Sequence, residues 1–118
     1  MAMDRVLVID WRCATTRTLG LACLQRGIGV AFAHNAGDGV CVLLDAPVDL
    51  VVLDATALRP TPREVATLVR YVAPGVPLVV TVRPETPLED RVALELDGFR
   101  VLVHPISVDE LIEKAWDV

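Results

Sequence analysis

Five short runs of apolar residues alternate along the chain with segments in which apolar residues recur every three or four positions. The runs lie at Arg5–Asp10, Gly29–Ala33, Leu50–Asp54, Leu78–Thr81 and Phe99–Val103. Most of them are continuously apolar and rich in valine, which is typical of parallel strands covered on both faces. The pattern therefore predicts five buried strands of one parallel sheet.

The segments between the runs have the period of amphipathic helices. Their apolar positions, segment by segment, are Leu19, Ala22 and Cys23; Val40, Leu43 and Leu44; Val65, Leu68, Val69 and Val72; Leu88, Val92 and Leu96; and Val108, Leu111, Ile112 and Ala115. A capping box, with Ser107 as N-cap and Glu110 three residues on, predicts where the last helix begins. Strict alternation of strand and helix predicts an α/β domain, a doubly wound parallel sheet with helices on both faces.

Length and composition narrow the class of protein. The chain has 118 residues, 53% of them hydrophobic, and a net charge of −5. It fits a single domain over residues 1–118 and is too apolar to be disordered. No run is long enough to span a bilayer and no signal region opens the chain, so we expect a cytoplasmic protein. Without a basic stripe, direct binding to nucleic acid is not expected.

The three cysteines are an odd number and lack metal-ligand spacing. Cys23 and Cys41 fall in apolar helical segments, and we predict that both are small core residues. Cys13 follows the first strand, where it is either a plain loop residue or a reactive thiol.

Polar residues stand at, or one position past, the carboxyl ends of four predicted strands: Asp10, Asp54, Thr81 and His104. In doubly wound sheets this edge carries the binding or catalytic site. Two carboxylates brought together repel each other, and a hard cation such as Mg²⁺ relieves the repulsion. An aspartate beside Mg²⁺ can attack a phosphoryl group, and Thr81 can donate its hydroxyl to a phosphoryl oxygen. Either acid alone would suit a helix cap; together with Thr81 they predict a solvent-reachable phosphoryl site.

The chain resembles the receiver domain of two-component response regulators over about residues 4–117. The resemblance rests on Asp10 after the first strand, "VVLDAT" around Asp54, "VVTV" around Thr81 and "VLVHP" ending in His104 and Pro105. It implies a flavodoxin-like fold with strand order 2-1-3-4-5 and a cis peptide bond before Pro105. It also implies that Asp54 is the phosphoacceptor, that Thr81 contacts the phosphoryl group, and that Mg²⁺ binds Asp10, Asp54 and the backbone carbonyl of Thr56.

The chain departs from the family pattern around this site. Trp11 stands where a second acid is usual, which should weaken the binding of Mg²⁺. His104 replaces the family's lysine, and an ordinary imidazole is mostly neutral at pH 7, so a permanent charge is lost unless His104 protonates beside the phosphoryl group. Val101 replaces an aromatic switch residue, and the segment after Asp54 lacks the usual Pro-x-x-x-Gly loop.

Three functions are open at this point. The first is an atypical response regulator receiver in a phosphorelay, which takes a phosphoryl group from a histidine kinase or phosphotransfer protein and is no enzyme beyond its own phosphorylation and dephosphorylation. The second is a phosphorylation-independent pseudo-receiver that binds a protein target through residues 88–116, with a homodimer through the last helices as a further option. The third is another doubly wound domain, binding flavin or phosphate with "CATTRT" at 13–18 as its loop.

Three further residues, Arg83, Trp11 and Trp116, have a structural and a functional interpretation each. Arg83 either reaches the phosphoryl oxygens or is solvated in a loop. Trp11 covers the site or anchors a partner, and Trp116 packs against the sheet or anchors a partner. His34 is expected at the surface.

Overall fold

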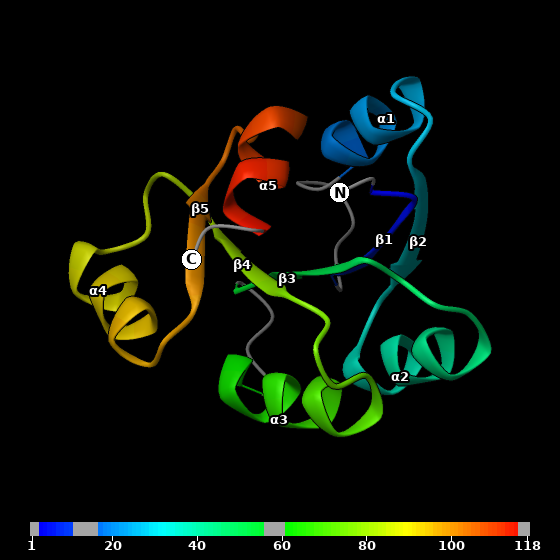
Figure 1. Cartoon of the computed structure of the whole chain (residues 1–118). Helices are drawn as coiled ribbons and strands as arrows, with labels where there is room; N and C mark the ends of the chain where they lie inside the picture. Colours follow the sequence, from blue (N-terminus) through cyan, green and yellow to red (C-terminus); the bar gives the residue numbers. More distant parts are fainter. Residues whose placement is uncertain (1–2, 11–16, 56–60, 116–118) are drawn as a thin grey trace.

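The structure is a computed structural model that describes residues 3–10, 17–55 and 61–115, and Figure 1 shows the whole chain. All strand pairs are parallel, and the strand order is β2-β1-β3-β4-β5. The strands are β1 (Arg5–Ile9), β2 (Gly29–Ala33), β3 (Leu50–Asp54), β4 (Leu78–Val82) and β5 (Arg100–Val103). The predicted doubly wound, flavodoxin-like sheet is confirmed, and the strand ends lie within one residue of the predicted runs.

Helices cover both faces of this sheet (Figure 1). On one face lie α1 (Arg17–Gln25) and α5 (Val108–Ala115); on the other lie α2 (Ala36–Asp45), α3 (Pro62–Val72) and α4 (Leu88–Leu96). Side chains cap the N-termini of α2 and α5. At α2, Asn35 accepts a hydrogen bond from the Asp38 N–H at 2.8 Å. At α5, the predicted capping box forms between Ser107 and Glu110.

The core divides according to the two-residue period of the strands. Val8, Val52 and Val79 belong to the cluster that α1 and α5 cover. Leu53 and its equivalents on β1 pack instead beneath α2 and α3. Because successive strand residues alternate between these faces, this period also determines which face each strand-end residue approaches.

The fourth helix is present where the apolar period predicts it, but its apolar stripe does not face the core. Leu88, Val92 and Leu96 are 69%, 42% and 82% exposed. No residue of α4 is buried, and its half-buried Leu94 packs against the cluster beneath α3 and α4. The stripe faces outward because α4 lies beside the edge strand β5 and turns its Leu94 side to the sheet.

Other predicted core positions also differ from the structure. Cys23 is buried as predicted, and burial raises the pKa of its thiol while the charge of Arg26 opposes that rise. Cys41 was predicted as a core residue but is exposed, as are Leu44 and Leu68, because these positions lie at the border of their helices' buried faces. Phe32 is partly exposed because β2 is an edge strand and is not covered on both faces.

The remaining predictions have different outcomes. His34 is exposed as expected, whereas Cys13 and Trp116 lie outside the described residues. Within the described ranges, no helix has the length and apolarity that crossing a bilayer requires. The single domain over residues 1–118 and the cytoplasmic location stay predictions.

Candidate functional site

Three polar residues form one row across β1, β3 and β4. Asp54 and Thr81 are direct partners in the β3–β4 register. Ile9 is the partner of Leu53, so the next residues, Asp10 and Asp54, follow in the same register. The Asp10 N–H also donates to the Ala33 carbonyl at 2.9 Å, which continues the ladder past the end of β1. Since neighbouring strands lie about 4.8 Å apart, the three residues stand side by side.

The same three residues emerge on one face of the sheet. Each stands two positions after a residue that packs beneath α1 and α5: Val8, Val52 and Val79 precede Asp10, Asp54 and Thr81. Strand side chains repeat every two residues, so the row lies on the α1 and α5 side of the carboxyl edge. The expectation that these residues come together at one edge of the sheet is confirmed.

The row is fully buried, which differs from the predicted solvent-reachable site. Asp10, Asp54 and Thr81 are each 0% exposed. Among the described residues, the Thr81 hydroxyl oxygen has no hydrogen-bond partner. A buried hydroxyl without a partner is unfavourable, so this oxygen is available to an incoming group. Two carboxylates in adjacent positions away from water also repel strongly, which favours a cation between them.

Arg83 and His104 form a second pair of polar residues, and Arg83 follows Thr81 by one side-chain repeat. The register pairs Val82 with Val103, so the next residues, Arg83 and His104, stand side by side. The His104 N–H also donates to the Val82 carbonyl at 2.9 Å. His104 is half-buried and, as the resemblance implied, is joined to Pro105 by a cis peptide bond. Buried nitrogens of both side chains, Arg83 Nε and His104 Nε2, have no hydrogen-bond partner among the described residues.

The position of Arg83 could have been inferred more firmly from the sequence. It follows Thr81 by two residues and precedes Pro84, which disfavours a helical conformation at position 83. The strand alternation therefore continues to Arg83. The structure places it in the loop directly after β4 as a half-buried residue, so its side chain is only partly solvated.

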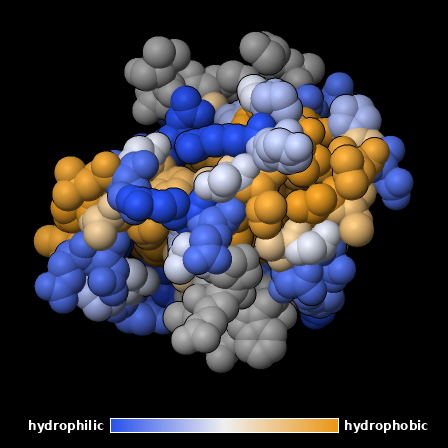
Figure 2. Space-filling view, turned by 90° about the horizontal axis from the view of Figure 1, so that it is seen from below, coloured by the Kyte–Doolittle hydropathy of each residue, from blue (hydrophilic) through white to orange (hydrophobic). Residues whose placement is uncertain are grey.

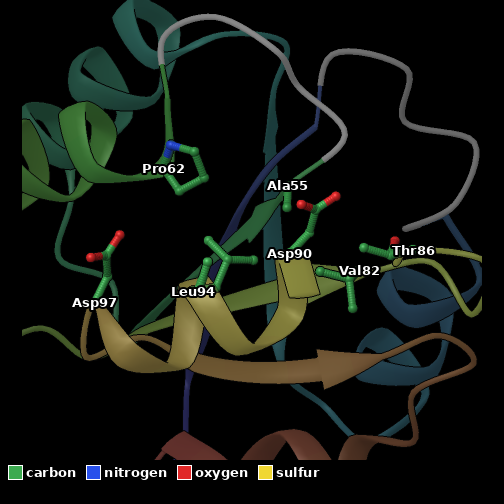
Figure 3. Close-up of a pocket in the computed structure, with 8 residues that line it drawn as sticks. Ala55, Pro62, Val82, Thr86, Asp90, Leu94 and Asp97 are labelled. Atoms are coloured by element: carbon green, nitrogen blue, oxygen red, sulfur yellow. The ribbon is translucent and has the colours of Figure 1, made fainter. Parts of the chain in front are cut away.

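Cavities lie on both sides of these strand ends. One of about 280 Å³ adjoins His104 and is lined by Thr18, Leu19, Pro84, His104, Pro105 and Ile106. Another of about 280 Å³ lies between α3 and α4, with Pro62 on one side and Leu94 and Asp97 on the other (Figure 3). Its lining includes Ala55 and Val82, the chain neighbours of Asp54 and Thr81. One cavity thus borders chain neighbours of the row, and the other borders His104.

The donor set at the row suits a hard cation with few protein ligands. Among the described residues, no three His, Cys, Asp or Glu side chains group closely enough to hold a metal ion. Asp10 and Asp54 offer two carboxylates, and Mg²⁺ commonly binds through one or two carboxylates together with water and phosphate oxygens. Thr56 and Trp11, the other residues that the resemblance associates with this cation, lie outside the described residues.

No protein-family model and no curated protein sequence matches the chain. Solved structures match it over almost its whole length. The chemotaxis protein CheY4 of Vibrio cholerae has a TM-score of 0.75 at 21% identity, covering 95% of both chains. A response regulator receiver domain of Clostridium thermocellum has a TM-score of 0.77 at 15% identity, covering 96% of this chain and 91% of that one. This chain has the receiver-domain fold.

The receiver fold does not by itself assign the chemistry. The adenylate cyclase of Rhodopirellula baltica also matches, with a TM-score of 0.74 at 16% identity, covering 94% of this chain and 83% of that one. One fold can carry different functions, and at such low identity the similarity establishes architecture alone. What this receiver fold does therefore depends on Asp10, Asp54, Thr81 and their surroundings.

Proposed function

We propose that this chain is an atypical receiver module that accepts a phosphoryl group on Asp54 in two-component signalling. The observation that carries the proposal is the row of Asp10, Asp54 and Thr81 on one face of the carboxyl edge. Asp54 is the nucleophile, and the Thr81 hydroxyl, which has no partner among the described residues, donates to a phosphoryl oxygen. His104, on the adjacent strand end, is a further contact for that group.

Mg²⁺ is the cofactor that this proposal includes. Asp10, Asp54 and the backbone carbonyl of Thr56 would hold it, and it would neutralise charge that develops on the phosphoryl oxygens. Trp11 adds no carboxylate beside Asp10, so we expect weaker binding of Mg²⁺ than a third acid would allow.

The partners follow from the same chemistry. An aspartyl phosphate needs a phosphoryl donor, and we propose a histidine kinase or a phosphotransfer protein in that role. The chain would then be a regulatory phosphoacceptor whose reactions are limited to its own phosphorylation and dephosphorylation. Residues 13–18, on which the flavin or phosphate-binding alternative rests, lie for the most part outside the described residues.

Phosphorylation at Asp54 is tested with acetyl phosphate, MgCl₂ and intact mass spectrometry. We expect the wild-type chain to gain one phosphate and Asp54→Asn to gain none, because the amide is a poor nucleophile. Asp45→Asn is the matched control, since Asp45 is an exposed carboxylate at the end of α2 and should leave the gain unchanged. A phosphate on Asp54→Asn, or none on the wild type, contradicts the proposal.

A second candidate function follows from the exposed stripe of α4. Leu88, Val92 and Leu96 recur every four residues and face away from the sheet. Figure 2 shows one apolar area on the side of the molecule where α4 lies in Figure 1, and another on the opposite side, where α2 lies. Contiguous exposed apolar surface marks sites of protein association. The α4, β5 and α5 face is therefore the proposed surface for a protein target or a homodimer, with or without phosphorylation.

Self-association through this face is tested by sedimentation velocity over a range of concentrations. We expect Leu96→Glu to weaken any dimer by about tenfold or more, because a charge would be buried at the contact. Leu44→Glu, at a comparably exposed leucine of α2, should leave the dimer unchanged. Equal weakening of the dimer by both variants would show that α4 is not the contact. If the protein is a monomer at every concentration, the homodimer is excluded and only a different protein can be the partner of this face.

A further inference from the structure

Buried polar atoms without a partner gather at the ends of β4 and β5. Among the described residues, four such side-chain atoms occur, and three of them belong to Thr81, Arg83 and His104. The fourth is Nε of Arg91, on helix α4. Thr81 is fully buried, while Arg83 and His104 are half-buried, so these polar atoms are withdrawn from water.

The backbone arrangement explains why the three residues are neighbours. Arg83 follows Thr81 at the two-residue strand repeat, and His104 stands beside Arg83 through its hydrogen bond to the Val82 carbonyl. The Arg83 carbonyl accepts a hydrogen bond from the Thr86 N–H at 3.0 Å, which closes a turn with Pro84 at its second position. The turn holds the backbone of Arg83 at the rim, one repeat beyond the row that contains Asp54.

All three atoms can act as hydrogen-bond donors. The threonine hydroxyl and the arginine Nε–H donate, and histidine Nε2 donates in the tautomer or charge state that carries a proton there. Buried donors without acceptors are unfavourable, and a cluster of donors is best satisfied by an anion. A guanidinium is always charged, whereas a histidine is not, so the permanent positive charge of this cluster resides on Arg83.

We infer that Arg83, together with Thr81 and His104, forms the anion-binding side of the site and provides the fixed positive charge that the receiver pattern places at position 104. For the identity of the anion, a phosphoryl group on Asp54, this inference rests on the proposed function. In this inference the positive charge comes from the end of β4 and not from the end of the neighbouring strand β5. Arg83 is a binding residue for the phosphoryl group and takes no part in forming or breaking its bonds.

The test measures the binding of beryllofluoride, a phosphoryl mimic, by calorimetry in MgCl₂. We expect Arg83→Gln to weaken binding by about tenfold or more, because a charge-assisted hydrogen bond is lost. Arg83→Lys keeps the charge and should recover part of the affinity. Arg91→Gln is the matched control, since its Nε is also buried and, within the described ranges, has no partner, but lies on α4. Its affinity should stay within about twofold of the wild type.

A second readout separates this inference from the proposed function. Sulfate is titrated in MgCl₂ while the ¹⁵N resonances of the Arg83 and His104 side chains are followed. Shifts of both resonances in the wild type, with no His104 shift in Arg83→Gln, support the anion site even if Asp54 takes up no phosphate. Unchanged beryllofluoride affinity in Arg83→Gln, alongside normal phosphorylation of Asp54, overturns the inference and leaves the proposed function intact. Sulfate that shifts neither resonance also overturns it.

Discussion

Replacing Asp10 by asparagine is expected to stabilise the protein in the absence of divalent cations and to abolish its stabilisation by Mg²⁺. Asp10 and Asp54 are adjacent in register and fully buried. Two like charges about 5 Å apart repel by roughly 3 kcal/mol at an effective dielectric constant of about 20. Removing one charge should therefore raise the free energy of unfolding by about 1–3 kcal/mol, less whatever the Asp10 carboxylate gains from its contacts in the native protein.

Urea unfolding in EDTA and in MgCl₂ measures both effects. The wild type should gain about 2.7 kcal/mol when Mg²⁺ is present at a hundred times its dissociation constant. The Asp10→Asn variant should show no such gain, and the exposed Asp45→Asn should behave like the wild type. A loss of stability in EDTA would mean that the Asp10 carboxylate is held by favourable contacts and is not poised for a cation.

Replacing Leu111 by alanine is expected to lower the free energy of unfolding by about 2–5 kcal/mol, the usual range when a fully buried leucine is truncated. Leu111 lies on α5 with no exposed surface and packs against the sheet face that also carries Asp54. Its loss leaves a cavity that close-packed strands cannot fill without shifting. Chemical denaturation measures the change directly.

Leu96→Ala is the control for this experiment because both leucines belong to the apolar period of a predicted helix. Leu96 is 82% exposed, so its truncation should change stability by no more than about 0.5 kcal/mol. A large loss at Leu96 would indicate that the α4 stripe is covered in solution, as a dimer through that helix would require. Repeating the measurement at several protein concentrations would then identify the dimer.

Some features of the candidate site were predicted from the residue pattern, and others from the family resemblance. The position of Asp10, Asp54, Thr81 and His104 at strand ends follows from the apolar runs themselves. The strand order and the cis bond before Pro105 were implied by the resemblance and not by any period, and the structure has both. The roles of these residues stay predictions until phosphorylation is measured.

By itself, the sequence determined the alternation of strands and helices, the capping box of α5 and the strand-end positions of the polar residues. These features depend on neighbours only a few positions apart, so they can be inferred from a single chain. Only the tertiary structure decided the register that aligns Asp10 with Asp54 and Thr81, the placement of Arg83 beside His104, and the outward orientation of the α4 stripe. Each of these depends on contacts between residues distant in the chain, and an apolar stripe indicates a face that can be buried without showing what covers it.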